Sequence, residues 1–472
     1  MVVGEITQKT DLLIIGAGPG GYAAAFRAAD LGLDVTIVDE RDNIGGVCLY
    51  EGCIPSKTLL YLAELIHDAA RVEKMGVQFG PPQLDLQALR SWKESVVNKL
   101  GRGLAGLSEK RDVQWLQARA FFEGPNTARL IGADVAHIKF RHAIVATGSV
   151  PQIYPGHEVT AAGRVMTSTE ALDLADIPER LLIVGGGYIA LEMGQVYAAL
   201  GSRVSMVVRS EFLRGLDRDL VKPLARRMED LCEEIHLGTV IDSLAEHKDG
   251  VDVQLKNDKG EIRAERYDRV LVAMGRVPSA QELGLEKTGV RLDEKGFIIV
   301  DEKQQTDEPS IFAIGDVVPG PMLAHRAMRQ GKVAAEVIAG QPSAYDVRAI
   351  PAVVYTDPQI AWCGLTEQEA QKQGAAVQVV RFPWGASGRA TTMGISDGLT
   401  KLVLEPESGR IRGAGIVGRD AEALIAECVL AIEMGALAED LALSIHPHPS
   451  LTETEAEAAE IYLGSSTHFI SK

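Results

Sequence analysis

Cysteine is scarce in this chain, with five cysteines among 472 residues. Only two of them stand close together, which is unlike the dense cysteine pattern of a secreted disulfide scaffold and typical of a reducing compartment. The N-terminus has no basic stretch followed by an apolar core, so no signal peptide is expected. We therefore expect a cytoplasmic protein.

Long apolar runs and an excess of positive charge are also missing. No run reaches the roughly 18 apolar residues of a transmembrane helix, so no membrane span is expected. Lysine and arginine number 48 against 65 acidic residues, a formal net charge of −17. Such a chain is unsuited to nucleic acid or to an anionic membrane surface. Its length and its hydrophobic content of 46% are enough for roughly three or four domains.

A dinucleotide-binding signature lies near the N-terminus. The apolar run 11–15 precedes a GAGPGG turn, a helix is predicted over 22–31, and a strand over 35–39 ends in Asp39. This is the full strand–GxGxxG–helix–strand–acid unit. Its glycines let the backbone approach a pyrophosphate at the helix N-terminus, and Asp39 can accept hydrogen bonds from a ribose. The three motif glycines are Gly16, Gly18 and Gly21.

A second signature begins at Gly185, with Gly187 inside it and Ala190 at its third glycine position, a replacement that the motif tolerates. An NAD site should end the next strand, predicted over 204–208, with an acid. Here the strand is followed instead by Arg209, and Arg214 comes shortly after.

Two guanidiniums could hold a 2′-phosphate, which would make the co-substrate NADP. Glu211 could still serve a ribose if the loop folds differently, and Arg209 and Arg214 could also be plain surface charges. Either NAD or NADP is therefore expected.

Two cysteines, Cys48 and Cys53, lie in the segment GGVCLYEGCIPSK, which ends at Lys57. A C-x-x-x-x-C pair just beyond a dinucleotide unit indicates a redox disulfide more than a metal site, because no second ligand pair follows. Pro55 fits an early helical turn, and a helix N-terminus below the sulfurs would favour a thiolate. No metal site is expected.

This segment resembles the active-site segment of the pyridine nucleotide–disulfide oxidoreductases, most closely the dihydrolipoamide dehydrogenases. The Ile-Pro-Ser-Lys ending favours them over the glutathione reductases. The resemblance covers nearly the whole chain, from about residue 10 to about residue 465. Tyr50 departs from it, since the family usually has Asn there.

The resemblance implies an α/β fold of two Rossmann-like nucleotide-binding domains, a small central domain and a C-terminal α/β dimerisation domain. The expected boundaries are 1–149, 150–277, 278–349 and 350–472. It also implies FAD, with NAD or NADP as co-substrate, and a homodimer. The expected partner is a lipoyl domain or carrier protein of a 2-oxoacid dehydrogenase, glycine cleavage or sulfur-oxidation system.

The resemblance further implies the reaction. Dihydrolipoamide would reduce a Cys48–Cys53 disulfide, with Cys48 exchanging with substrate and Cys53 next to the flavin. His448 would take the thiol proton, with Glu453 orienting it, because a thiol attacks a disulfide only as the thiolate. His446 is the rival base, but it matches the family's non-catalytic histidine.

Other positions are assigned by the same resemblance. Lys57 and Glu192 are expected to form an ion pair beside the flavin, and Tyr188 to cover the nicotinamide face. The further FAD-binding residues are Thr147, Gly148, Asp316, Met322, Leu323, Ala324 and His325. The nicotinamide-binding residues are Gly185, Gly187, Tyr188, Ile189, Glu192, Arg209, Arg214 and Gly275.

Three alternative functions stay open at this point. The Arg209 region alone favours an NADPH-dependent disulfide reductase of the glutathione-reductase type. A non-catalytic subunit that only binds a lipoyl carrier is disfavoured by the intact cysteines, His448 and Glu453. A flavin oxidase would have no use for the second nucleotide signature.

Overall fold

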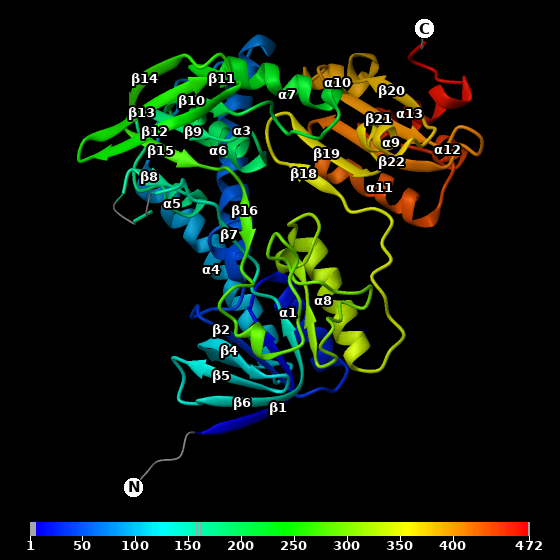
Figure 1. Ribbon diagram of the computed structural model, residues 1–472. Coiled ribbons are helices and arrows are strands. Elements are labelled where there is room, and N and C mark those ends of the chain that lie inside the picture. Colours follow the sequence, from blue (N-terminus) through cyan, green and yellow to red (C-terminus); the bar gives the residue numbers. More distant parts are fainter. Residues whose placement is uncertain (1–5, 157–158, 161–162, 471–472) are drawn as a thin grey trace. The chain divides into compact units, whose positions relative to one another are not determined.

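The computed structural model describes residues 6–156, 159–160 and 163–470 (Figure 1). The chain forms two compact units, each assembled from three separate segments. Unit 1 combines Met1–Thr58, Asp85–Gln152 and Gly275–Asp346. Unit 2 combines Leu59–Leu84, Ile153–Met274 and Val347–Lys472.

Unit 1 is built on a seven-stranded sheet of order β3-β2-β1-β6-β5-β4, with β17 beside β6. Its strands are β1 (Thr7–Ile15), β2 (Val35–Asp39), β3 (Gln114–Gln117), β4 (Arg119–Gly124), β5 (Thr127–Ile131), β6 (His137–Val145) and β17 (Ile311–Ala313). Strand β1 pairs in parallel with β2 and β6, and its residues Leu12, Leu13 and Ile14 are fully buried. A parallel strand covered on both faces needs such a continuous apolar run.

The helices and short elements of unit 1 surround this sheet. They are α1 (Pro19–Asp30), α2 (Gly46–Tyr50), α4 (Leu86–Glu109), η2 (Leu285–Lys287), η3 (Gly315–Val317), α8 (Ala324–Ile338) and the ribbon of β7 (Ser149–Pro151) with β16 (Arg276–Pro278). Helix α3 (Cys53–Arg71) begins in this unit. Helices α1 and α8 pack closely because glycine stands at the crossing: a Cβ on Gly331 would lie 2.5 Å from Gly20 O.

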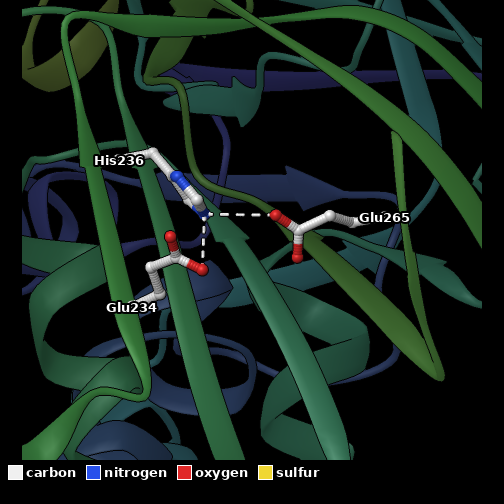
Figure 2. A group of neighbouring side chains, drawn as sticks. All are labelled: Glu234, His236 and Glu265. Carbon is white, nitrogen blue, oxygen red and sulfur yellow. Dashed lines mark ion pairs between the residues drawn. The ribbon is translucent and has the colours of Figure 1, made fainter. Parts of the chain in front are cut away.

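The first part of unit 2 is a second nucleotide-binding fold. A five-stranded sheet of order β11-β10-β9-β15-β8 is accompanied by a three-stranded antiparallel sheet, β12-β13-β14. The strands are β8 (Val165–Met166), β9 (Arg180–Val184), β10 (Arg203–Val208), β11 (Glu234–Leu237), β12 (Thr239–His247), β13 (Gly250–Asn257), β14 (Ile262–Tyr267) and β15 (Arg269–Val272). The helical elements are η1 (Val72–Met75), α5 (Ser168–Asp173), α6 (Tyr188–Ala199) and α7 (Arg218–Leu231). Glu234, His236 and Glu265 meet where β11 faces β14 (Figure 2).

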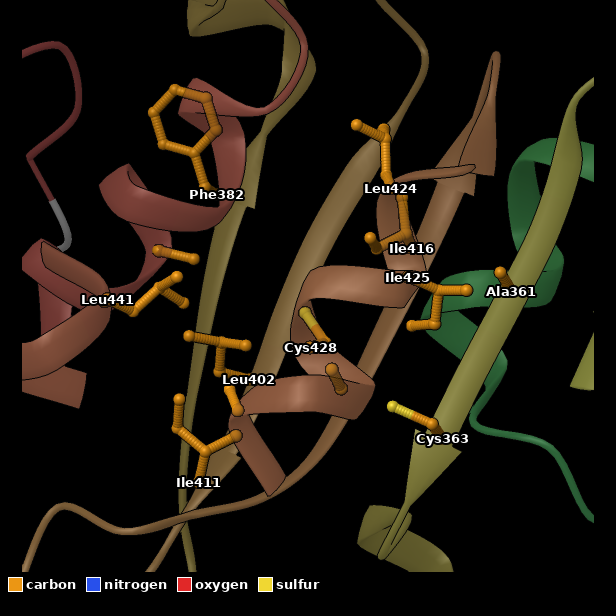
Figure 3. Close-up of a cluster of buried hydrophobic side chains, with 14 of the residues drawn as sticks. Ala361, Cys363, Phe382, Leu402, Ile411, Ile416, Leu424, Ile425, Cys428 and Leu441 are labelled. Atoms are coloured by element: carbon orange, nitrogen blue, oxygen red, sulfur yellow. The ribbon is translucent and has the colours of Figure 1, made fainter. Parts of the chain in front are cut away.

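The C-terminal part of unit 2 is an antiparallel sheet of order β18-β19-β22-β21-β20. Its elements are β18 (Ala352–Val354), β19 (Gln359–Gly364), α9 (Glu367–Gln373), β20 (Gln378–Pro383), η4 (Trp384–Ala386), α10 (Gly388–Met393), β21 (Leu399–Leu404), β22 (Ile411–Gly418), α11 (Ala421–Met434), α12 (Ala438–Leu443) and α13 (Glu453–Leu463). Cys363, Leu402, Ile425 and Cys428 lie in its buried core (Figure 3). Cys363 and Cys428 are thus part of a hydrophobic core.

The predicted α/β class with two dinucleotide units is confirmed. The helix expected over 22–31 begins earlier, at Pro19, because proline is favoured in the first helical turn, where its missing N–H costs no hydrogen bond. The helix after the second signature likewise begins at Tyr188, directly after Gly187. Among the described residues, no helix combines the length and the apolar content needed to cross a membrane.

Candidate active site and nucleotide sites

The two cysteines of the GGVCLYEGCIPSK segment lie on consecutive helices. Cys48 is in α2, and Cys53 is the first residue of α3. The hydrogen bond with the Cys53 thiol, followed by burial, raises the pKa of the Cys48 thiol, and the charge of Lys57 acts in the opposite direction. Two thiols in contact on adjacent turns have the arrangement that interconverts with a disulfide.

Two glycines hold this cysteine segment against the first dinucleotide turn. Gly45 and Gly46 have φ of +142° and +60°, which glycine adopts without strain. Gly45 N donates to Ala17 O at 2.9 Å, and a Cβ on Gly46 would lie 2.6 Å from Gly18 Cα. The thiol pair is therefore anchored directly beside the pyrophosphate-binding turn.

The first dinucleotide turn fits the pyrophosphate of FAD. Gly16 has φ +107°, and a Cβ there would lie 2.3 Å from Ala146 O. Gly18 is the N-cap of α1 and makes no side-chain cap, so the first N–H groups of the helix remain available to an anion. A Cβ on Gly21 would lie 1.9 Å from Gly16 O, so the helix can approach the strand only with glycine there.

Asp39 lies at the end of β2, as predicted, and braces this turn. Its Oδ2 accepts from Ala17 N at 2.7 Å, and its Oδ1 accepts from Arg41 N at 2.9 Å. A ribose would have to share these oxygens through their remaining lone pairs.

Asp316 belongs to a polar cluster that the sequence did not indicate. Ser149 Oγ donates to Asp316 Oδ2 at 2.6 Å, and Arg276 Nε donates to Ser149 Oγ at 2.7 Å. Thr147 Oγ1 donates to Ser279 O at 2.6 Å, close to Gly148, which has φ +74°. Ser149 and Arg276 lie far apart in the sequence and form no motif, so no sequence signal reveals their contact.

The start of α8 offers a second helix N-terminus in unit 1. Its N-cap Leu323 makes no side-chain cap, so the first N–H groups remain available to an acceptor. Met322 and Leu323 precede the helix, and Ala324 and His325 are its first residues, with His325 exposed. The expected FAD-binding residues at positions 322–325 thus lie at the start of this helix.

The second dinucleotide turn, at the start of α6, is built in the same way. Gly185 has φ +138°, and a Cβ there would lie 2.2 Å from Ala273 O. Gly187 is the N-cap of α6 without a side-chain cap. Tyr188 and Ile189 open the helix, and Tyr188 is exposed.

The loop after β10 folds back onto this turn, with Leu213 N donating to Gly186 O at 2.8 Å. Arg209 and Arg214 are exposed, and within the part of the chain that the structure describes neither forms an ion pair. Glu211 is held by Arg218, whose Nη1 lies 3.1 Å from its Oε2. The nearest acid is therefore engaged, whereas the two arginines are available to an anion.

Two further residues predicted to bind the nicotinamide are Glu192, in unit 2, and Gly275, in unit 1. Glu192 is buried, and its Oε1 accepts from Tyr355 N at 3.0 Å. Gly275 has φ +129°, and its carbonyl accepts from Gln152 N at 2.9 Å. Lys57 belongs to unit 1 and Glu192 to unit 2, and their pairing stays a prediction.

His448 and Glu453 form the predicted imidazole–carboxylate pair. His448 Nδ1 lies 2.8 Å from Glu453 Oε1, and Ser450 N donates to the other oxygen at 2.6 Å. Glu453 begins α13 and is only partly exposed, whereas the His448 side chain is 71% exposed. The carboxylate thus fixes Nδ1 as the protonated nitrogen and leaves Nε2 as the basic one.

The rival base, His446, is engaged at both ring nitrogens. Its Nδ1 lies 2.9 Å from Ser444 O, and its Nε2 lies 3.1 Å from Glu427 Oε1. Its side chain is also largely buried. Both ring nitrogens of His446 are therefore engaged within the protein, and the choice of His448 over His446 as the base stays a prediction.

The chain was compared with known proteins. Residues 10–331 match the family described as pyridine nucleotide-disulphide oxidoreductase, and residues 350–459 match the dimerisation domain of that family. The fold and both matches define a flavoenzyme class that exchanges electrons between a nicotinamide and a sulfur group.

Dihydrolipoyl dehydrogenase from Vibrio parahaemolyticus is 45% identical, covering 98% of each chain. The enzyme of the same name from Geobacillus stearothermophilus is 44% identical over 100% of each chain. The chain belongs to the dihydrolipoyl dehydrogenases of the pyridine nucleotide-disulphide oxidoreductase family.

Solved structures agree with this assignment. LpdA from Mycobacterium tuberculosis superposes with a TM-score of 0.87 at 25% identity, covering 96% of this chain and 99% of that one. The HOCl-induced flavoprotein disulfide reductase RclA from Escherichia coli superposes with a TM-score of 0.84 at 26% identity, with the same coverage. The chain is an FAD-dependent oxidoreductase that acts on a sulfur group, uses a nicotinamide co-substrate and forms a homodimer.

Proposed function

We propose that Cys48 and Cys53 form the redox disulfide through which this enzyme oxidises dihydrolipoamide. One substrate thiolate attacks Cys48 Sγ, the Cys48–Cys53 bond breaks, and Cys53 leaves as the thiolate. The second substrate thiol then attacks the substrate sulfur of the mixed disulfide, which forms lipoamide and releases Cys48. Two electrons and two protons pass from substrate to enzyme. The contact between the two thiols carries this proposal.

His448 is the proposed proton acceptor. Its Nδ1 is tied to Glu453 at 2.8 Å, so Nε2 can take a proton from the incoming thiol and return it in the reverse direction. Because the family functions as a dimer, we assign this pair to the active site of the other subunit. FAD, when bound, accepts the electron pair from the reduced cysteines and delivers it to the nicotinamide.

Residues of unit 1 are proposed to hold that flavin. The N-terminus of α1 and the turn at Gly16 would bind the pyrophosphate, and Asp316, fixed by Ser149, would bind nearer the flavin. The N-terminus of α8 supplies further N–H donors. Lys57 and Glu192 are proposed to pair beside the flavin, and Tyr188 to cover the nicotinamide side.

NADP(H) is proposed as a better co-substrate here than it is for relatives that carry an acid after the equivalent strand. Arg209 and Arg214 are exposed, and their loop is bonded to Gly186. Glu211, the nearest acid, is paired with Arg218. An exposed arginine beside a phosphate-binding turn can bind a 2′-phosphate through charge-assisted hydrogen bonds.

The substrate carrier is proposed to be a lipoyl domain or carrier protein of a 2-oxoacid dehydrogenase, glycine cleavage or sulfur-oxidation system. A cytoplasmic location is inferred from the sparse cysteines. The four-domain division at 1–149, 150–277, 278–349 and 350–472 is also kept, supported by the dimerisation match that begins at residue 350.

Steady-state assays with the purified FAD enzyme test this function. Turnover of dihydrolipoamide with little reduction of glutathione disulfide is expected. A preference for glutathione disulfide over dihydrolipoamide would favour the alternative function, an NADPH-dependent disulfide reductase, which the Arg209 region alone indicates.

A further inference from the structure

A group of three ionisable side chains in unit 2 has no role in the chemistry described above. Glu234 and His236 lie two residues apart on β11 and so face the same side of that strand. Glu265 approaches them from β14, an edge strand of the three-stranded sheet (Figure 2). The three donor atoms lie within 4.8 Å of one another.

The separations between these donor atoms are those of ligands around one ion. His236 Nε2 lies 3.7 Å from Glu234 Oε2 and 3.6 Å from Glu265 Oε1, too far for hydrogen bonds. Zinc binds imidazole nitrogen and carboxylate oxygen at about 2.0–2.2 Å, so neighbouring tetrahedral ligands lie roughly 3.4 Å apart. Small side-chain shifts would bring all three donors to one metal ion.

Two of the donor atoms are buried. The Glu265 side chain is only 7% exposed, and its Oε1 is ion-paired with Arg263 Nε at 2.8 Å. His236 Nε2 is also buried, and it has no hydrogen-bond partner among the described residues. The other Glu265 oxygen accepts from Tyr267 at 2.7 Å, which fixes the carboxylate with Oε1 toward His236. Buried polar atoms usually have partners, so the unpartnered imidazole nitrogen requires an explanation.

A competing cation is present in the same cluster. Arg263 places Nη1 2.6 Å from Glu234 Oε1 and Nε 2.8 Å from Glu265 Oε1. Its side chain is 58% exposed and can swing into solvent. Arg180 also approaches Glu265, with Nη2 3.6 Å from Oε2. Arg263 therefore acts as a replaceable counter-ion for these carboxylates.

Another acidic group in unit 2 is different. Asp217, Asp219 and Glu367 surround Lys401 Nζ at 2.7, 2.8 and 2.7 Å. This buried ammonium supplies the positive charge and the hydrogen bonds, so that cluster is already complete. The cation of the Glu234–His236–Glu265 group is instead Arg263, whose side chain is 58% exposed rather than buried.

We propose that Glu234, His236 and Glu265 bind a divalent transition-metal ion of the zinc type and thereby tie β11 to β14. One imidazole and two carboxylates form a ligand set found in zinc sites, with a fourth position left for water. No metal was expected from the sequence, because the cysteine pair is not followed by a second ligand pair. Glu265 is 29 residues or more from its two partners, so the ligands form no sequence motif.

Equilibrium dialysis with Zn²⁺ alone, followed by metal analysis, tests the proposal. The protein is the FAD-loaded chain carrying Cys48→Ser and Cys53→Ser, so that the catalytic thiols bind no zinc. One zinc per subunit is expected. His236→Asn and Glu265→Gln should each weaken binding by at least about tenfold, since even loss of a residue supporting a ligand costs that much. His247→Asn is the matched control, because His247 lies on β12 and is paired with Asp252 at 3.1 Å, away from the three proposed ligands.

Arg263→Gln provides a second test. Because Arg263 is 58% exposed, this change does not carry the risk of misfolding that a substitution at a buried position has. Removing the competing guanidinium should tighten zinc binding, whereas a purely structural ion-pair network would gain no affinity. Co²⁺ in place of Zn²⁺ should give visible absorption bands that disappear in His236→Asn. Zinc binding that is absent from the parent, or that is unchanged in both His236→Asn and Arg263→Gln, would overturn the proposal.

Discussion

His448 Nδ1 lies 2.8 Å from Glu453 Oε1, and a backbone N–H from Ser450 holds the second oxygen of the same carboxylate. The carboxylate is thus positioned before any substrate arrives. His446, two residues earlier, has a contact within the protein at each of its ring nitrogens. The two neighbouring histidines therefore differ in their partners and in their exposure.

Replacing His448 with Gln should lower the turnover of dihydrolipoamide by about 10² to 10⁴, the usual contribution of a general base. Glu453→Ala should lower this turnover by a smaller factor, because the imidazole that accepts the proton remains. The measurement is steady-state kcat, together with reduction of the enzyme by small thiols, which should persist. His446→Gln is the matched control, and a larger loss there would reassign the base.

Cys48→Ser and Cys53→Ser should each retain FAD but lose lipoamide turnover, because neither variant can form the disulfide. Flavin absorbance reports cofactor retention, and the dihydrolipoamide assay reports activity. Cys232→Ser, which alters a thiol far from the GGVCLYEGCIPSK segment in the sequence, serves as the control. Full activity in either of the first two variants would contradict a redox disulfide.

The nicotinamide preference should depend on Arg209. A charge-assisted contact with a 2′-phosphate contributes about 1.5–3 kcal/mol, or about one to two powers of ten in affinity. Val208→Glu combined with Arg209→Met should therefore shift kcat/KM toward NAD by about that factor. If the wild type prefers NAD more than about a hundredfold and the double variant does not change this, the arginines only face solvent.

Lys401 should be essential for stability. Its ammonium is 1% exposed and contacts three carboxylates, so Lys401→Met leaves the buried Asp217 carboxylate without its ammonium partner, at a cost of about 3–5 kcal/mol. Chemical denaturation measures this loss, with the exposed Lys372→Met as control. Burial opposes ionisation of Asp219, but hydrogen bonds from Lys401 and Arg381 outweigh it and keep the pKa of Asp219 below its usual value.

The pH dependence of the stabilisation by Lys401 follows from the lowered pKa of Asp219. The stabilisation is present at neutral pH and is lost as the pH falls through the folded-state pKa of Asp219. The difference between wild type and Lys401→Met should therefore shrink in acid. A difference that stays constant from neutral pH to acid would show that Lys401 acts through packing rather than charge.

Glu455 should make stability fall as the pH rises. Burial, followed by the charge of Glu427, raises the pKa of Glu455 to about 8, while the Cys428 thiol acts against this. The folded state therefore holds a proton that the unfolded chain releases near its ordinary pKa of about 4.3. The stabilisation contributed by protonated Glu455 is complete below the unfolded-state pKa of about 4.3 and is lost as the pH rises toward 8.

Glu455→Gln mimics the protonated acid and should remove this dependence. Its Tm should exceed that of the wild type by an amount that grows between pH 5 and pH 8, reaching about a few degrees. Thermal unfolding at several pH values provides the measurement, with the exposed Glu439→Gln as control. An increase in Tm that does not vary between pH 5 and pH 8 would mean that Glu455 is charged in the folded state throughout this range.

Local features of the chain were predictable from the sequence. Both glycine turns, the helices that follow them, and the placement of Cys48 and Cys53 around a helix start depend on residues only a few positions apart. Tight turns and uncapped helix N-termini follow from glycine and spacing alone. The close His448–Glu453 contact is also local, since the two residues are five positions apart.

Contacts between distant segments were decided only by the tertiary structure. Ser149 reaches Arg276 across 127 positions and Asp316 across 167, and Glu265 meets His236 only through the packing of β14 near β11. Lys401 stands out as a charge in the apolar strand LTKLVL, but its carboxylate partners cannot be read there. Sequence periodicity tells which face of a strand is buried, whereas the register and packing of the sheets determine which side chains meet on that face.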